Sequence, residues 1–345
     1  MIRENGGWQC LPLSWRYLSK VGLTSLLMIC AARMAVGQSL CVEQSDEAIT
    51  IKQNNVAVLT YVKVSPPAPA GIDRIYERSG CLHPVQTPAG RCVTAMFPAD
   101  HAHQHGIFSA WVNTTFDGQK VDFWNLAGRT GRVKHEAVAA TFQEDAMAGF
   151  QVSLVHRAEE LEVDVLREIW KVTAHATDGS FHQFDLETTQ TALTDKPLTV
   201  NKYHYGGIAL RGPTRWLTDR DSYARRQPEI SREPSGFVNH LRSDRAKGNH
   251  EHTKWVALWG MFDKQPVSIA VLCHKDNFRA PQAARLHPTK PYFCFAPCVD
   301  GSFSIDRERP FHSRYRFLIT DARPDGEWLD QQWAQWCGID DGDSR

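Results

Sequence analysis

The sequence lacks a net charge, because its 39 Lys and Arg residues balance 39 Asp and Glu residues. Without a basic excess, nothing in the composition draws the chain to nucleic acid or to an anionic membrane surface. A run of roughly 20 apolar residues, the length that crosses a bilayer, is also missing. The apolar run Val21–Ala32 is shorter and is followed by Arg33. These absences predict a small-molecule or oligosaccharide ligand, neutral or modestly polar, and no nucleic-acid partner.

Cysteine pairs with metal-binding spacing are missing as well. Seven cysteines follow residue 37, and they are scattered along the chain: Cys41, Cys81, Cys92, Cys273, Cys294, Cys298 and Cys337. In an exported protein this odd number predicts a partial disulfide framework with at least one free thiol. The pair Cys294 and Cys298 is only a weak zinc signal, and buried small apolar side chains are the simpler interpretation.

The first forty residues have the pattern of a signal peptide. Arg3, Arg16 and Lys20 precede the apolar run, and the small residues 35–37 offer a cleavage site. We expect a signal peptide over residues 1–37 and an exported, periplasmic or extracellular mature chain without a stable membrane span. A retained membrane anchor is the alternative.

The rest of the chain alternates apolar and polar residues with the period of β-strands. This alternation is clearest in the segments 161–172, 181–189, 254–262 and 311–319. Residues 49–62 predict a hairpin that turns at Asn54 and Asn55, which tolerate positive φ. We therefore expect an all-β fold, a single large antiparallel β-sandwich over residues 38–345.

Two segments depart from this strand pattern. Residues 327–336 place Leu329, Trp333 and Trp336 at helical spacing, which predicts a short C-terminal helix packed on a sheet. Residues 219–249 are rich in Arg, Ser and Asp, and we expect a solvated loop excursion there.

Three imidazoles stand at alternate positions in the segment Asp100–Gly106. If this segment is extended, His101, His103 and His105 point to one face. They could then bind one divalent metal ion, since imidazole suits Zn, Cu, Fe and Ni. Alternatively they form a metal-free cleft in which one histidine acts as acid or base. The sequence leaves both alternatives open.

Further candidates are scattered through the chain. The catalytic candidates are His103, His105, His204 and Asp100, and His287 and His312 could complete either kind of site. Guanidinium groups can grip carboxylates or vicinal hydroxyls, and Arg211, Arg279 and Arg285 lie near Gly/Pro turns. Trp111 and Trp124 could stack a sugar ring. The predicted substrate-binding set is Arg211, Arg279, His287, Trp124 and Trp111.

Several motifs together resemble a family of exported proteins labelled PmoA-like, or "methane oxygenase PmoA". They are His83-Pro84-x-x-Thr87-Pro88-x-Gly90, Pro98-x-Asp100-His101-x-His103-x-His105-Gly106, Asp122-Phe123-Trp124 and Gly131-Arg132-Val133-x-His135. Later segments of the chain, including 205–213, 276–279 and 287–292, follow in the expected order. The resemblance covers roughly residues 45–337. The label implies a membrane copper enzyme, a class that a chain without transmembrane spans does not fit.

A looser likeness is to the galactose-mutarotase-like supersandwich. His105-Gly106 leading to Asp122-Phe123-Trp124, and Asn201-Lys202-Tyr203-His204-Tyr205, look similar to motifs of that group. The resemblance implies a large antiparallel sandwich with a sugar cleft. The second motif is shifted by inserted residues, and the general-base Glu of that group is not placed in this sequence, so the likeness is carried over to the architecture and the sugar cleft and not to the reaction.

Three functions follow from these patterns. The first is an exported carbohydrate-active enzyme that performs elimination, hydrolysis or epimerisation in a histidine-rich cleft. The second is a carbohydrate-binding protein without catalysis. The third is a metal-dependent oxygenase.

Overall fold

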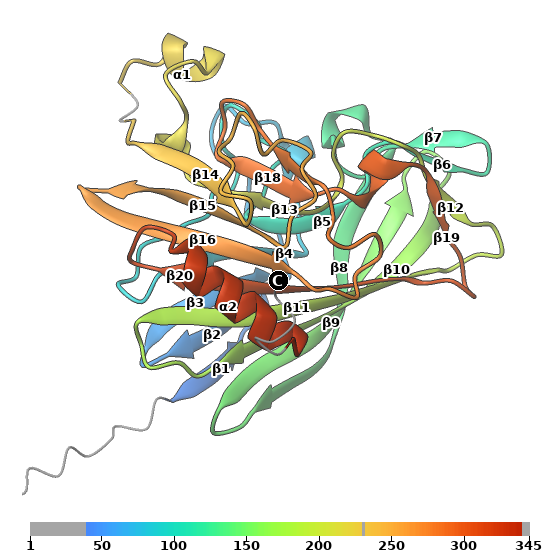
Figure 1. Ribbon diagram of the computed structural model, residues 1–345. Helices are drawn as coiled ribbons and strands as arrows, with labels where there is room; N and C mark the ends of the chain where they lie inside the picture. The colour runs from blue at the N-terminus through green and yellow to red at the C-terminus, as the bar shows by residue number, and fades with distance from the viewer. Residues whose placement is uncertain (1–38, 230–231, 340–345) are drawn as a thin grey trace, which may run out of the picture. The chain divides into compact units, whose positions relative to one another are not determined.

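The computed structural model describes residues 39–229 and 232–339, and these residues fold mainly into antiparallel β-sheets (Figure 1). The predicted all-β antiparallel sandwich with a short C-terminal helix is confirmed. The predicted signal peptide lies outside the described residues. Within them, no helix is both long enough and apolar enough to span a membrane.

The first sheet has eight strands and carries most of the residues that concern function. In spatial order its strands are β1 (Leu40–Gln44), β2 (Ala48–Gln53), β3 (Val56–Val62), β4 (Cys81–Val85), β5 (Ile107–Ala110), β13 (Gly207–Arg211), β18 (Tyr292–Phe295) and β17 (Ala284–Leu286). Asn54 and Asn55 turn the β2–β3 hairpin with φ of 51° and 66°. The predicted hairpin is therefore confirmed.

The second sheet also has eight strands and contains the long meander. Its order is β14 (Ser235–Asn239), β15 (Trp255–Phe262), β16 (Gln265–Cys273), β20 (Phe311–Thr320), β11 (Phe181–Ala192), β10 (Val163–His175), β9 (Met147–Ala158) and β8 (Gly131–Gln143). Strand β14 lies inside the segment for which we expected only loop. That prediction is wrong because residues 235–239 pair with β15 and complete the sheet edge.

A small third sheet and a few short helices complete the described chain. The third sheet contains β19 (Phe303–Ile305), β12 (Leu198–Val200), β6 (Thr114–Phe116) and β7 (Gln119–Val121). The helices are α1 (Ser222–Arg226), α2 (Gly326–Cys337) and the 3₁₀ turns η1 (Arg74–Tyr76), η2 (Leu126–Gly128), η3 (Thr214–Trp216) and η4 (Pro297–Asp300).

The two large sheets bury a shared apolar core. Phe293 and Phe295 of β18 contact Phe237 of β14 and Tyr315 of β20, with ring centroids 6.0 Å and 5.6 Å apart. Because side chains alternate along a strand, Tyr292 of β18 lies on the opposite face of the first sheet. That outer face of the first sheet carries the candidate site.

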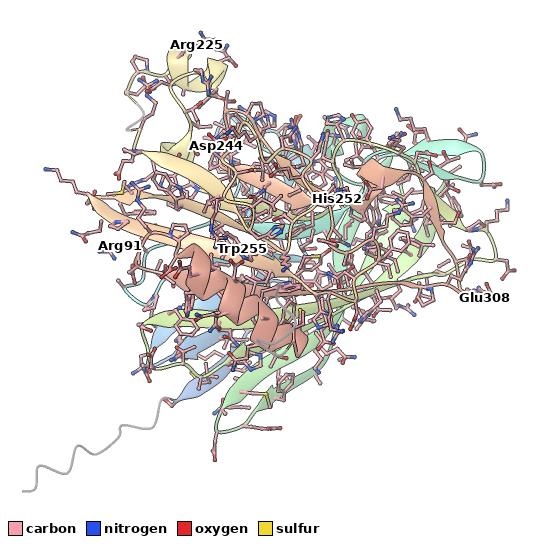
Figure 2. The ribbon with its side chains drawn as sticks, in the orientation of Figure 1. Arg91, Arg225, Asp244, His252, Trp255 and Glu308 are labelled. Carbon is pink, nitrogen blue, oxygen red and sulfur yellow. The ribbon has the colours of Figure 1, made fainter. Side chains whose placement is uncertain are left out.

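Helix α2 packs on the second sheet as the sequence predicted. Asp325 caps its first turn by accepting hydrogen bonds from the backbone N–H groups of Glu327 and Trp328. Leu329 and Trp333 are buried against the sheet. Trp255, labelled beside the helix in Figure 2, donates its indole N–H to the Asp330 carboxylate at 2.8 Å.

All seven cysteines of the described chain are free thiols. The predicted partial disulfide framework is therefore wrong. Cys273, Cys294 and Cys298 are buried, and burial raises the pKa of the Cys294 thiol to about 11. These thiols behave as small apolar core groups, as the simpler interpretation of the sequence held.

Candidate functional site

The histidine-rich segment is a pair of turns, and strand β5 begins only at Ile107. The His101 N–H donates to the Pro98 carbonyl at 2.8 Å, and the Gln104 N–H donates to the His101 carbonyl at 2.9 Å. Turns do not alternate their side chains with a period of two. The condition for the three imidazoles to share one face, an extended segment, is therefore not met.

Two of the three imidazoles line a common cavity and the third does not. The His101 and His103 rings lie 5.3 Å apart, centroid to centroid, at its wall. His105 is fully buried and packs edge-to-face on Phe97 at 4.6 Å. His105 is thus a core residue, and its predicted catalytic role has no support from its position.

The cavity has a volume of roughly 140 Å³, and its lining includes Arg285 of β17 and Tyr292 of β18. We call it the histidine cavity. Its lining residues come from segments far apart in the sequence: His101, His103, Gln104, Trp124, Asn125, His204, Tyr205, Arg285, His287 and Tyr292. Of the candidates outside the histidine-rich segment, His204, His287, Trp124 and Arg285 line this cavity.

The aromatic wall of the histidine cavity is rigidly packed. Trp124 is only 1% exposed, and its ring is enclosed by Phe108, Tyr205 and Tyr292 with centroids 4.6, 5.3 and 5.8 Å away. Such a ring cannot offer an open platform for stacking a sugar. The predicted stacking role of Trp124 is therefore corrected: its ring forms part of the cavity wall.

Asp122 holds the loop that carries Asn125. Its carboxylate accepts the backbone N–H groups of Trp124 and Asn125 at 2.8 Å and 2.9 Å, and also the Asn125 amide N–H at 2.8 Å. The same Asn125 amide points at the Tyr205 hydroxyl, 3.4 Å away. Asp122 therefore positions a hydrogen-bond donor beside the phenol.

The imidazoles of His103 and His287, which line the histidine cavity, are neutral at neutral pH. Burial, aided by neighbouring positive groups, lowers the pKa of both His103 and His287 to about 3. The Nδ1 atom of His287 accepts the backbone N–H groups of Thr289 and Lys290, each at 3.2 Å. The neutral ring therefore carries its proton on Nε2, where it can donate.

Tyr205 and Arg285 add a proton donor and a positive charge to the neutral imidazoles of the histidine cavity. Burial raises the pKa of Tyr205 to about 12, so its hydroxyl remains protonated. Arg285 donates to the Asn249 side-chain oxygen at 2.8 Å and to the Leu286 carbonyl at 3.1 Å. Within the described residues, no carboxylate lies within 4.0 Å of the Arg285 guanidinium, so its charge is available to a ligand.

Asp100 and Arg211 are brought together, but they do not line the histidine cavity. Arg211 donates to both carboxylate oxygens of Asp100, and both side chains are fully buried. Arg211 also donates to the Gln104 side-chain oxygen at 2.8 Å. The predicted catalytic role of Asp100 and the substrate-binding role of Arg211 are corrected on this ground. The ion pair instead supports the turn that carries His103.

The remaining predicted residues lie elsewhere. Trp111 is fully buried and donates its indole N–H to Gln190 at 2.7 Å. Arg279 donates to the carbonyls of Pro297 and Gly301, each at 2.7 Å. His312 is exposed on β20 and contacts Thr189. None of these three lines the histidine cavity, so Trp111 and Arg279 lack their predicted contact with substrate there.

The predicted metal ligands do not assemble. In the described ranges 39–229 and 232–339, no group of three or more His, Cys, Asp or Glu side chains is arranged to hold a metal ion. The reason is the turn at residues 98–104, which separates His105 from His101 and His103.

Sequence reasoning missed four residues of this cavity: Gln104, Asn125, Tyr205 and Tyr292. Gln104, Asn125 and Tyr205 each stand next to a residue that it did select, and Tyr292 does not. An amide or a phenol beside a selected histidine or tryptophan, as in Trp124-Asn125 and His204-Tyr205, was the available signal.

The sequence matches one known protein family over most of its length. Residues 48–334 match the description "Family of unknown function (DUF6807)". The chain belongs to this family. No protein of curated function matches this DUF6807 member.

Two solved structures show a distant likeness to this chain. Heparan sulfate lyase HepC from Pedobacter heparinus and a mutant of it each superpose with a TM-score of 0.35 and 8% sequence identity. Each comparison covers 84% of this DUF6807 chain and 36% of the other. The chain thus spans about a third of the length of these lyase structures.

Proposed function

We propose that this protein is an exported enzyme that acts on a carbohydrate by proton transfer, through elimination or epimerisation, in the histidine cavity. The observation that carries the proposal is the combination of groups on one concave wall. The neutral imidazoles of His103 and His287 and the protonated phenol of Tyr205 meet there with the guanidinium of Arg285, which has no carboxylate partner among the described residues. A base, an acid and a cation are the groups that such proton transfers need.

The chemistry assigns each group a task. The imidazole of His103 takes a proton from a carbon next to a carbonyl or carboxyl group of the sugar. Arg285 stabilises the negative charge that develops on that group, and this charge also favours the imidazolium formed. In an elimination, Tyr205 gives its proton to the departing sugar oxygen, so that a carbon–carbon double bond replaces the C–H and C–O bonds. In an epimerisation, His103 keeps the proton that it took, Tyr205 delivers its own proton to the opposite face of the carbon, and proton exchange with solvent restores both groups.

Glycoside hydrolysis fits the cavity less well. Most glycosidases use two carboxyl groups that flank the glycosidic bond. Of the described residues that line the histidine cavity, none is Asp or Glu. This composition favours elimination or epimerisation over the hydrolysis that the sequence also allowed.

A carbohydrate-binding protein without catalysis is the second candidate. A shallow groove lined by aromatic faces would favour it, because sugars stack on exposed rings. Here the imidazoles and Arg285 share a concave pocket, and Trp124 has no free face. The enzyme is therefore the better supported of the two.

Turnover by a His103→Gln variant tests the proposal. Purified protein is incubated in D₂O with tetrasaccharides of galacturonate, hyaluronan, heparin, cellulose and xylan, and NMR follows new double bonds and deuterium on carbon. We expect one of these saccharides to react, and His103→Gln to lose about 100-fold or more of the rate. His312→Gln, an exposed histidine outside the cavity, is the matched control. Full activity of His103→Gln would overturn the proposal, and binding without turnover would favour the binding protein.

A further inference from the structure

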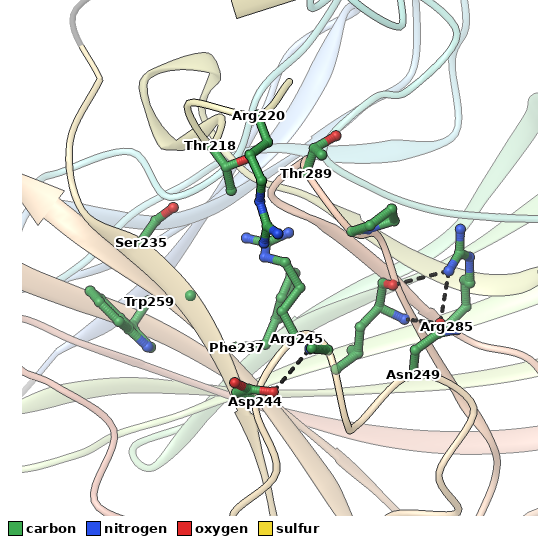
Figure 3. A pocket seen from close by; sticks show the side chains of 14 residues that line it. Thr218, Arg220, Ser235, Phe237, Asp244, Arg245, Asn249, Trp259, Arg285 and Thr289 are labelled. Atoms are coloured by element: carbon green, nitrogen blue, oxygen red, sulfur yellow. Dashed lines mark hydrogen bonds between the residues drawn. The ribbon is translucent and has the colours of Figure 1, made fainter. Parts of the chain in front are cut away.

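A second and larger cavity borders the histidine cavity. Its volume is roughly 730 Å³, within the range of cavities that hold drug-sized ligands. Figure 3 is a close-up of this cavity. The residues that line it include Arg220, Arg245, Arg285, Phe237, Trp259 and Thr289. We call it the arginine cavity. Strand β14 and the end of β17 form part of its lining.

Among the described residues, Arg220 and Arg245 of the arginine cavity have no carboxylate partner, as Arg285 has none. Figure 3 shows the side chains of Arg220 and Arg245 running toward the same part of the cavity. Among the described residues, no Asp or Glu oxygen lies within 4.0 Å of either group. Two cations held close together without an anion repel each other, and a bound anion would relieve this repulsion.

Arg245 is built into the cavity wall. Its Nη1 atom donates to the carbonyls of His287 and Lys290 at 2.6 Å and 2.5 Å, and its guanidinium lies 4.5 Å above the Phe237 ring. Its Nη2 atom is buried and has no hydrogen-bond partner among the described residues. Burial and the nearby Arg220 lower the pKa of Arg245 to about 10, so it stays charged at neutral pH. An unused charged donor is what an anionic ligand requires.

The acidic residue of this lining faces its own turn. The Asp244 carboxylate accepts the backbone N–H groups of Ala246 and Lys247 at 3.0 Å and 3.1 Å. It is the one acidic group among the described residues that line the arginine cavity, against three arginines. The local charge therefore remains positive.

Arg285 joins the two cavities, since its side chain lines both. The residues after it divide between them. His287 faces the histidine cavity, whereas Pro288 and Thr289 face the arginine cavity. A chain of sugar residues with one member at His103 and His287 would reach the arginine cavity across Arg285.

From this geometry we infer that the arginine cavity is an anion subsite. It holds the carboxylate or sulfate group of the sugar residue next to the one that reacts, through Arg220 and the free Nη2 of Arg245. The substrate is then an acidic oligosaccharide. This inference deepens the proposed function and rests on it for the position of the reacting sugar.

Binding to an inactive enzyme tests the subsite separately from catalysis. Calorimetry in the His103→Gln background measures affinity for tetrasaccharides of galacturonate (carboxylate), heparin (sulfate and carboxylate) and cellulose (neutral). Arg220→Gln removes one guanidinium that is exposed and makes no hydrogen bond within the described chain. Arg245→Lys keeps the positive charge and removes the planar guanidinium with its Nη2 donor. Arg225→Gln, on α1 and labelled in Figure 2, removes an equal charge outside the cavity.

We expect an acidic tetrasaccharide to bind at least tenfold more tightly than the neutral one. Arg220→Gln should weaken that binding about tenfold, and Arg225→Gln should leave it unchanged. Preference for galacturonate or for heparin then identifies carboxylate or sulfate as the anion. Equal affinity for acidic and neutral saccharides, or equal loss in Arg220→Gln and Arg225→Gln, would overturn the inference.

The two proposals fail in different ways. If acidic saccharides bind through Arg220 but the wild-type protein converts none of them, the subsite stands and the catalytic proposal falls. If the wild-type protein converts a neutral saccharide and Arg220→Gln changes nothing, catalysis stands and the anion subsite falls.

Discussion

Asp100 and Arg211, 111 residues apart in the chain, form a bidentate ion pair whose Nη2–Oδ1 distance is 2.6 Å. Lys290 extends it, with its Nζ 3.3 Å from an Asp100 oxygen and 2.6 Å from an Asp221 oxygen. The arrangement ties the turn that carries His103 to β13 and to the loop that carries His287. The neighbouring His101 imidazole, together with Arg211 and Lys290, holds the pKa of Asp100 well below its usual range, despite burial.

Asp100→Asn is expected to destabilise the fold strongly. Removing one partner of a buried ion pair leaves an uncompensated charge and typically costs about 3–5 kcal/mol. Urea unfolding measures the change. The matched control is Asp195→Asn, which breaks the exposed pair with Arg307 and should cost less than about 1 kcal/mol. Equal losses in the two variants would contradict the structural role of Asp100.

Gly106→Ala is expected to disrupt the start of β5. Gly106 has φ of +55°, and an added Cβ would lie 2.1 Å from the Leu82 carbonyl oxygen. Gly90 is the matched control, because its φ of +77° is also positive but nothing lies within 4 Å of an added Cβ. Alanine at position 106 should cost at least about 2 kcal/mol more than alanine at position 90, as overpacking does. Similar unfolding midpoints for the two variants would refute the close approach.

Stability is expected to fall as the pH drops below about 6.5. His103 and His287 have a folded-state pKa of about 3 and His83 of about 4, all below the ordinary 6.5. Between pH 6.5 and these values, the unfolded chain binds protons that the folded chain does not. The free energy of unfolding therefore decreases on acidification, by up to about 1.4 kcal/mol per pH unit for each such histidine.

Urea unfolding at pH 7, 6, 5 and 4 measures this slope. His103→Gln removes one of the three groups and should flatten the dependence, whereas the exposed His312→Gln should leave it unchanged. If the free energy of unfolding depends on pH with the same slope in wild type and in His103→Gln, then His103 has the same pKa in the folded and unfolded states.

Tyr205→Phe is expected to reduce turnover by about 100-fold while the fold is preserved, because it removes the proposed proton donor. The lost hydroxyl contacts Asn125 at 3.4 Å. Tyr203→Phe is the control, since Tyr203 neighbours His204 but does not line the histidine cavity. Rates are compared on whichever tetrasaccharide the wild-type protein converts. Unchanged turnover in Tyr205→Phe would assign the acid to another group.

Local patterns predicted the regular elements of this protein well. The β2–β3 hairpin follows from alternation and two asparagines, and α2 follows from the spacing of Leu329 and Trp333. Both depend on residues that lie close together in the chain. The edge strand β14 was missed because its pairing with β15 bridges a long polar connection.

The candidate site was predictable in part. The sequence singled out His101, His103, His204, His287 and Trp124, which do meet. It could not show that residues 98–104 form turns, because those hydrogen bonds lie within a segment whose alternation also suits a strand. Nor could it show that Arg211 binds Asp100 rather than a ligand.

By itself, the sequence determined the β-rich fold, the C-terminal helix and the residue types available for chemistry, since periodicity and side-chain chemistry are local properties. Only the tertiary structure decided which of those residues meet. The pairing of Asp100 with Arg211, the burial of His105 and the sharing of Arg285 between two cavities all depend on contacts between distant segments. Such contacts are set by how the sheets pack, which no single stretch of the chain encodes.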